Sequence, residues 1–234
     1  MSAHDPTATE TVRWRPGARV ARLRASHDYR WALLLIVGTF LFAAAAPDAG
    51  WARSIFCLLE AATLGLVLWT SGVTHDFRVR LALAGVGLGV AAAALVDHSA
   101  AAQGTVWIVN VALTMAIVVV IGRGIADQGE VNRQSVTGSI CVYILIGLLF
   151  TFVYGAAAAL GSSPFFAQGT DGTTSLRFYF SYVTLATLGY GDYTPAGNFG
   201  HTVAIVEALL GQLYLVTVVA LLVANMGKTR AATR

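Results

Sequence analysis

The stretch of sequence that decides the fold of this chain reads Thr187-Leu188-Gly189-Tyr190-Gly191-Asp192. It lies between a short apolar stretch at residues 178–186 and a longer one at residues 199–226. Glycine accepts backbone dihedral angles that a side chain forbids, so glycines at alternate positions allow successive carbonyl oxygens to point to one side. Rings of such carbonyls from several chains can replace the water around a dehydrated cation. Thr187 would add a hydroxyl below these carbonyls, and Asp192 a carboxylate at the mouth.

This stretch resembles the potassium-channel signature, Thr-x-Gly-Tyr-Gly-Asp, with Leu188 at the variable position. Residues 181–186 look like the pore helix that aims at the filter, and residues 192–195 look like the exit that follows it. The resemblance is to bacterial potassium channels with six transmembrane helices and one pore loop. It implies an all-α membrane protein with a re-entrant pore helix and selectivity filter between helices five and six. A chance Gly-Tyr-Gly turn in a membrane protein is disfavoured by the apolar stretches on both sides.

The composition is that of a membrane protein. The chain has 234 residues, of which 56% are hydrophobic and 12% charged, whereas a soluble domain is about 25% charged. The charges cluster between long apolar runs, so the net charge of +3 does not indicate nucleic-acid binding. Cys57 and Cys141 both fall inside apolar runs, which favours small buried side chains over a disulfide framework.

Apolar stretches predict six helices. The first is short, and the next three have about 18 residues each, enough at 1.5 Å per residue to cross a hydrocarbon core of about 30 Å. The six stretches are residues 31–46, 54–72, 79–96, 105–122, 136–160 and 199–226, with Gly227 expected to end the last. The first stretch also resembles a signal peptide, but its long basic lead favours a retained helix. Residues 161–175 are rich in Gly, Ser and Thr and predict an exposed loop.

The chain is expected to divide into five parts: a basic segment (1–30), a four-helix bundle (31–122), a linker (123–135), a pore domain (136–227) and a short tail (228–234). The bundle stands in the place of a voltage sensor. A sensor needs an arginine at every third position of its fourth helix, and residues 105–122 contain none. The bundle is therefore expected to lack voltage sensing.

The basic residues predict the orientation in the membrane. If the amino end is cytoplasmic and six helices cross, thirteen of the fifteen basic residues lie inside and only Arg53 and Arg177 lie outside. This bias follows the positive-inside rule. It predicts a multi-pass protein with both termini cytoplasmic and Asp192 outside, and the resemblance implies that the membrane is the bacterial inner membrane. The basic segment itself is either a contact with anionic lipid head groups or simply a topology signal.

The resemblance also assigns the site. A filter needs a closed ring, which implies a homotetramer in which each chain supplies one strand. Potassium ions would be held by the Thr187 hydroxyl and by the carbonyls of Thr187, Leu188, Gly189 and Tyr190, with Gly191 and Asp192 at the mouth. The Tyr190 side chain is expected to point away from the pore and to pack against the pore helix. The residues expected to support it there are Tyr179, Phe180, Val183 and Thr184. Some family members carry a glutamate where this chain has Val183, so a carboxylate pair with the mouth aspartate is not expected.

Two ionisable residues fall inside predicted helices. Glu207 is expected to be neutral or hydrogen-bonded to the pore helix, and Gly211, one turn later, either bends the helix as a hinge or packs closely against the fifth helix. Glu60 is expected to face the bundle interior and to approach Asn110, or alternatively to reach toward Arg53.

The sequence does not predict an enzyme, because it contains no Ser-His-Asp arrangement, phosphate loop or paired catalytic carboxylates. Its histidines have no metal-ligand spacing, so no cofactor is expected besides the permeant potassium ions. The expected partners are potassium ions, membrane lipids and further copies of the chain, with no nucleic acid. The prediction is passive potassium transport. The alternatives are a less selective cation channel, a non-conducting membrane interaction subunit, or a potassium transporter, which usually carries four non-identical pore loops in one chain.

Overall fold

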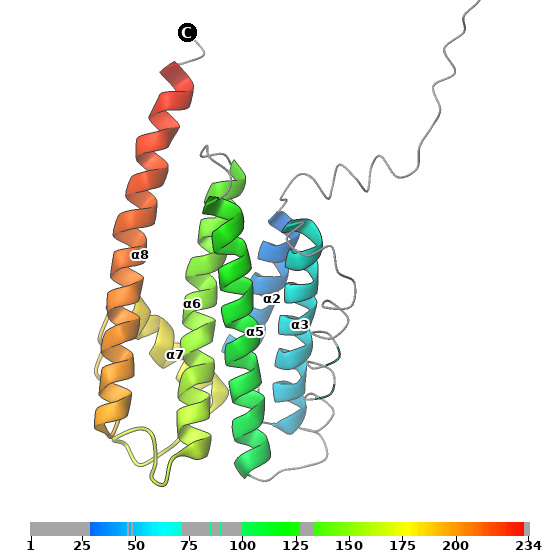
Figure 1. Cartoon of the computed structure of the whole chain (residues 1–234). Coiled ribbons are helices and arrows are strands. Elements are labelled where there is room, and N and C mark those ends of the chain that lie inside the picture. Colours follow the sequence, from blue (N-terminus) through cyan, green and yellow to red (C-terminus); the bar gives the residue numbers. More distant parts are fainter. Residues whose placement is uncertain are drawn as a thin grey trace, which may run out of the picture.

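The structure, a computed structural model, describes residues 29–45, 47, 49–71, 85, 89, 100–126 and 133–231. Within these residues the only regular elements are helices (Figure 1). They are α2 (Arg30–Ala45), α3 (Gly50–Ser71), α5 (Ala100–Ala126), α6 (Arg133–Leu160), α7 (Thr174–Leu185) and α8 (Asn198–Ala231). The expected all-helical fold is confirmed in this part of the chain. Nearly all of the third predicted helix, at 79–96, and nearly all of the basic segment lie outside the described residues.

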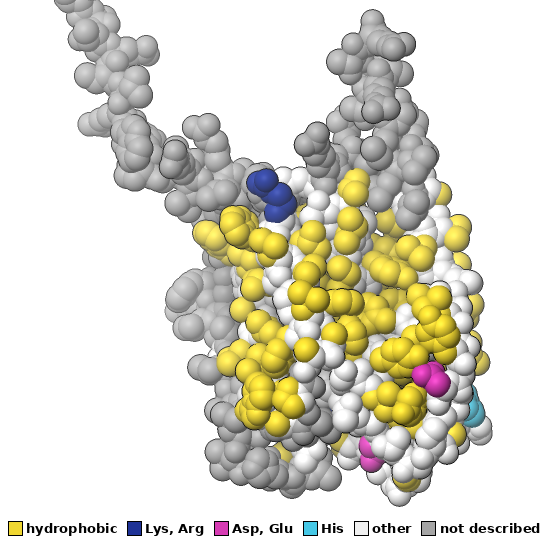
Figure 2. All heavy atoms as spheres, turned by 180° about the vertical axis from the view of Figure 1, so that it is seen from behind, with side chains coloured by type: hydrophobic (Ala, Val, Ile, Leu, Met, Phe, Trp, Pro, Cys, Tyr) yellow, Lys and Arg dark blue, Asp and Glu magenta, His cyan; other side chains and the backbone are white. Residues whose placement is uncertain are grey.

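Three of the described helices are long and apolar enough to cross a membrane. The qualifying stretches are Ala102–Ala126, Gln134–Leu160 and Asn198–Val218, while the apolar helices Arg30–Ala45 and Ser54–Trp69 are shorter. Hydrophobic side chains cover much of one face, with a basic side chain at one end and acidic ones toward the other (Figure 2). The chain is therefore a helical protein with several membrane-crossing segments.

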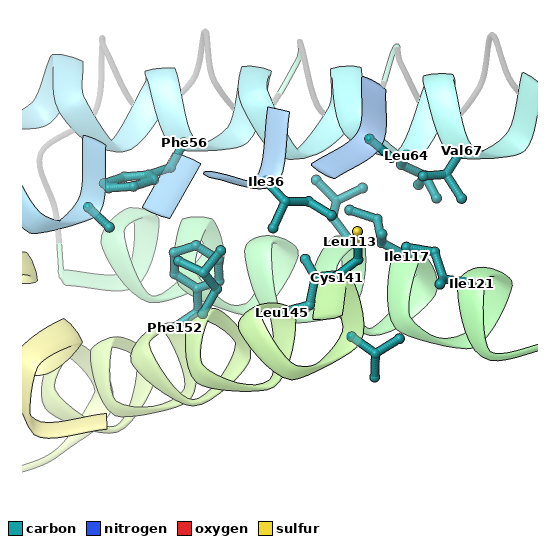
Figure 3. Close-up of a cluster of buried hydrophobic side chains, with 14 of the residues drawn as sticks. Ile36, Phe56, Leu64, Val67, Leu113, Ile117, Ile121, Cys141, Leu145 and Phe152 are labelled. Atoms are coloured by element: carbon teal, nitrogen blue, oxygen red, sulfur yellow. The ribbon is translucent and has the colours of Figure 1, made fainter. Parts of the chain in front are cut away.

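Helix α6 is the centre of the arrangement. It contacts α2, α5, α7 and α8, whereas α8 contacts only α6 and α7 among the described helices (Figure 1). The main core lies where α2, α3, α5 and α6 meet, and it includes Ile36, Phe56, Leu113 and Leu145 (Figure 3). Hydroxyl groups inside these helices, such as that of Thr114, donate to the carbonyl four residues earlier. These hydroxyl groups are thus satisfied within their own helix, as an apolar surrounding requires.

Helix α8 runs as far as Ala231, so the prediction that Gly227 ends it is wrong. A glycine ends a helix when it takes up a left-handed conformation. Gly227 instead keeps the helical backbone.

Most of the loop between α6 and α7 is exposed, as predicted, except at two aromatic residues. Phe165 and Phe166 are buried, and they form a second apolar cluster with Phe150, Tyr154 and Phe180. The loop is also tied to the segment that follows the signature, because Ala167 N donates to Thr194 O at 2.9 Å and Ala196 N donates to Phe165 O at 2.8 Å. The Gly, Ser and Thr content of the loop did not predict that these two phenylalanines would be buried.

Glu60 lies inside the bundle with 1% of its surface exposed, so it does not face lipid. Its carboxyl group interacts with Thr114, one turn beyond Asn110. The Asn110 amide donates to Cys57 Sγ at 3.2 Å and to Val106 O at 2.9 Å. The two helices therefore meet around this polar pair, but the contact runs through neighbouring side chains and not directly from Glu60 to Asn110.

Candidate ion-conduction site

The site begins with the short helix α7, whose first turn is held by the residues just before it and by a contact with α5. Thr173 is the N-cap, and its hydroxyl accepts a hydrogen bond from Leu176 N at 3.1 Å. Arg177 is 5% exposed and donates to Asp171 O and Gly172 O at 2.9 and 2.6 Å. Its guanidinium also lies 5.1 Å from the centre of the Trp107 ring of α5. Cations are attracted to the face of an indole, so this contact joins the start of α7 to α5.

The end of α7 passes directly into the signature. Thr187 N donates to Thr184 O and Leu188 N donates to Val183 O, each at 2.9 Å. These two bonds fix the first residues of the signature to the last turn of the helix. The helix dipole places partial negative charge at this end, which favours a cation there.

The backbone of the signature alternates in handedness. Thr187, Gly189 and Gly191 have φ angles of 56°, 58° and 76°, while Leu188 and Tyr190 between them do not have positive φ. Such an alternation turns successive carbonyl groups toward the same side. The glycines were expected to make this possible, but the left-handed Thr187 was not. A β-branched residue in this region is an outlier that costs about 1–3 kcal/mol, and it persists here beside the two hydrogen bonds to α7.

The mouth of the site is held by side chains from two directions. Tyr179 OH donates to Asp192 Oδ2 at 2.8 Å, and the Tyr179 ring stacks on that of Tyr190 with centroids 6.5 Å apart and planes 7° apart. Gln168 Nε2 donates to Asp192 O at 2.9 Å. Phe180, expected beside Tyr190, instead packs in the second apolar cluster with Tyr154 and the loop phenylalanines. It faces away because α7 presents successive residues to different sides. Sequence reasoning missed Gln168, because its partner Asp192 lies 24 residues further along the chain.

Behind α7, a carboxyl group from α8 occupies the place where three helices meet. Glu207 is 0% exposed; its Oε2 accepts from Tyr154 OH of α6 at 2.5 Å, and its Oε1 lies 2.5 Å from Ser181 Oγ of α7. Val183 of α7 is a buried apolar residue and supplies no carboxyl group here. The carboxyl group behind this site therefore comes from α8.

Gly211 lies one turn after Glu207 and touches α7 as well. A Cβ built at Gly211 would lie 2.5 Å from Leu185 O and 2.8 Å from Leu185 Cδ1. This is a close packing contact, as one of the two interpretations held, but its partner is α7 and not the fifth helix. The reason is geometric, since α7 lies against α8 on this side. Residues 207 and 211 of α8 thus face residues 181 and 185 of α7, with the same spacing of one turn.

Comparisons with known proteins find similarity to ion channels in the part of the chain that contains this site. Residues 148–228 match the family described as "Ion channel", a span that contains the later part of α6 from residue 148, all of α7, the signature and most of α8. The chain is also 30% identical over 110 residues to the inward rectifier potassium channel Kirbac3.1 of Paramagnetospirillum magnetotacticum. That match covers 47% of this chain and only 37% of the relative. No solved structure matches the chain. The matches show that residues 148–228 are similar to ion channels and that part of the chain is similar in sequence to a potassium channel.

Proposed function

We propose that the chain is one subunit of a homotetrameric potassium channel, through which potassium passes down its electrochemical gradient. In this proposal the Thr187 hydroxyl and the carbonyl groups of Thr187, Leu188, Gly189 and Tyr190 hold the ions. The observation that carries the proposal is the alternating backbone of residues 187–191 directly after a short helix. Carbonyl rings of this kind replace the hydration shell of a permeant cation. The named function of the similar channel supports potassium as that cation.

The surface of the single subunit supports assembly with further copies. Leu188 and Tyr190 are 56% and 66% exposed in the single subunit. In the proposed channel, strands from other copies would pack beside them to close the ring. An apolar stripe on α8 is also uncovered; it consists of Ile205, Leu209, Leu213 and Val216, which are 53–71% exposed. Their spacing of three or four residues puts them on one helix face, and neighbouring copies around a four-fold axis would cover that face.

We propose the bacterial inner membrane as the location, with both termini cytoplasmic. The start of α2 and the end of α8 lie at the same end of the molecule, and so do the end of α5 and the start of α6 (Figure 1). Arg123 and Arg133 belong to these two helix ends, as the positive-inside rule requires of a cytoplasmic end. The loop before α7 and the mouth residue Asp192 would then face outside. The helices' apolar outer surfaces would contact membrane lipids.

A flux assay tests the function. The purified protein is reconstituted in liposomes with a potassium gradient, and the potential at zero current is measured in mixtures of potassium and sodium. A potassium channel gives a zero-current potential close to the equilibrium potential of potassium. Equal permeation of sodium would favour a less selective cation channel, and no flux from a correctly assembled tetramer would favour a non-conducting interaction subunit. Mass measurement of the detergent-extracted protein tests the tetramer independently.

A further inference from the structure

The buried carboxyl group of Glu207 has no part in the proposed ion sites. Its contacts show which oxygen atoms must carry hydrogen. Its two oxygens contact two hydroxyl groups, those of Tyr154 and Ser181, each at 2.5 Å. The Ser181 oxygen also lies 2.8 Å from the backbone oxygen of Gly147 on α6. Ser181 therefore stands between two oxygens at hydrogen-bond distance.

A hydroxyl group has one hydrogen to donate, so Ser181 cannot donate to both. The carbonyl oxygen of Gly147 can only accept. If Ser181 donates to Gly147 O, the contact with Glu207 is a hydrogen bond only when Glu207 Oε1 carries a proton and donates to Ser181. In that state every one of these contacts is a hydrogen bond. If Glu207 is ionised, Ser181 must turn its hydrogen to Oε1, and the contact between Ser181 and Gly147 holds no hydrogen.

The surroundings favour the protonated state. Glu207 is fully buried, and its partners in the described part of the chain are hydroxyl groups, with no basic side chain among them. The titratable groups that face it are Tyr154 from α6 and Tyr182 from α7, both neutral phenols. Tyr182 OH is itself engaged, because it donates to Ile144 O at 2.6 Å. An unpaired buried carboxylate costs several kcal/mol, whereas the neutral acid has all its contacts satisfied.

We propose that Glu207 binds a proton and, through the chain of hydrogen bonds from Glu207 to Ser181 to Gly147, acts as the positioning residue that fixes α7 between α6 and α8. This proposal rests on the proposed function for its consequence at the ion sites. Ser181 precedes Leu185 by one turn, and Leu185 lies two residues before Thr187. Loss of the proton breaks the hydrogen bond from Ser181 to Gly147 of α6 and places a negative charge behind α7, so conduction falls as the pH rises through the titration of Glu207.

The conservative variant Glu207→Gln separates the two protonation states. A glutamine amide can donate from Nε2 to Ser181 while its oxygen accepts from Tyr154, which reproduces the bonds of the protonated acid. Potassium flux in Glu207→Gln should therefore stay within about twofold of the wild type at neutral pH, and its decline at alkaline pH should disappear. Ser181→Ala removes the link to both partners. It should lower the ratio of potassium to sodium flux about tenfold, which corresponds to one hydrogen bond of about 1.4 kcal/mol. A Glu207→Gln variant that loses flux while keeping the alkaline decline would overturn the proposal.

Infrared spectroscopy tests the proton itself and does not depend on conduction. The purified full-length protein is titrated with alkali in detergent, and the band of protonated carboxyl groups is followed. The wild type should show a band that disappears on titration and is absent from Glu207→Gln. The matched control is Glu60→Gln, which removes the other buried carboxyl group of the described helices and should leave the Glu207 band in place. Identical spectra for the wild type and Glu207→Gln would show that Glu207 is ionised and would overturn the proposal, whatever the flux assay finds.

Discussion

A single methyl group at Gly211 tests the close contact between α7 and α8. In Gly211→Ala the new Cβ would lie 2.5 Å from Leu185 O, whereas an ordinary contact begins at 3.4 Å. The two helices must therefore separate by about 0.9 Å at this point, because the atom in the way is backbone and cannot rotate aside. Overpacking of this kind costs about 1–3 kcal/mol. The alanine also returns about 1 kcal/mol of helix propensity, so the net loss of stability is about 0–2 kcal/mol per subunit.

The displacement matters more for conduction than for stability. Leu185 O belongs to the last turn of α7, to which Thr187 is hydrogen-bonded through Thr184. A shift of about 0.9 Å there is comparable to the difference between well-formed and poor ion coordination, so the permeability ratio of potassium to sodium should fall at least tenfold, equivalent to about 1.4 kcal/mol. The assay is the reversal potential in mixed potassium and sodium, with unfolding in detergent measured in parallel.

Gly65→Ala in α3 is the matched control. Nothing lies within 4 Å of a Cβ built at Gly65, so this variant should gain up to about 1 kcal/mol of helix stability with unchanged selectivity. If Gly211→Ala kept wild-type selectivity but altered the open probability, Gly211 would be a hinge, and packing against Leu185 would not limit the pore. Unchanged selectivity and stability together would refute the reasoning from the contact.

Three further predictions follow from features of the site and the bundle. Gly189→Ala should abolish selective conduction, because an L-residue in the left-handed region costs about 1–2 kcal/mol in each subunit; an unchanged reversal potential would reject the filter assignment. Open probability should change only shallowly between about −100 and +100 mV, because a charge crossing the field gains about 2.3 kcal/mol per 100 mV and α5 has its Arg123 only in the last turn; a steep sigmoidal conductance–voltage curve would contradict this. A double-mutant cycle of Arg177→Gln and Trp107→Leu, read from unfolding in detergent, should give a coupling free energy of about 0.5–2 kcal/mol, and strictly additive effects would show that the two side chains do not interact.

Local patterns predicted the elements of the ion-conduction site well, because the information lies in adjacent residues. The run before Thr187 predicted a short helix, and α7 lies there, although it begins at Thr174, earlier than the apolar run suggested. The apolar stretches predicted α2, α3, α5, α6 and α8 to within a few residues at most ends. The left-handed Thr187 could not be read from its residue type, since threonine normally avoids that region.

Partners far apart in the chain were the part that sequence reasoning could not supply. Tyr154 and Glu207 are 53 residues apart, and no pattern in either segment names the other. The prediction that Glu207 is hydrogen-bonded named α7 correctly, but not the second bond to α6. Gly211 invited two explanations from sequence, and only the position of Leu185 O identifies its neighbour. When two residues lie far apart in the chain, local sequence patterns do not identify which hydroxyl or carbonyl group will contact a buried side chain.

The contacts that hold α7 within its own subunit bear on the order of folding and assembly. Ser175 Oγ donates to Ala44 O of α2 at 2.9 Å, and the Phe40 ring of α2 meets the Phe178 and Tyr182 rings at 4.9 and 5.0 Å. The short helix α7 is thus held by contacts within its own chain, which need no other copy. In the proposed tetramer, four folded subunits would then associate in a late step through the apolar stripe on α8. Mutations on that stripe should leave folded monomers, whereas mutations at Phe40 should act earlier and lower the yield of folded chain.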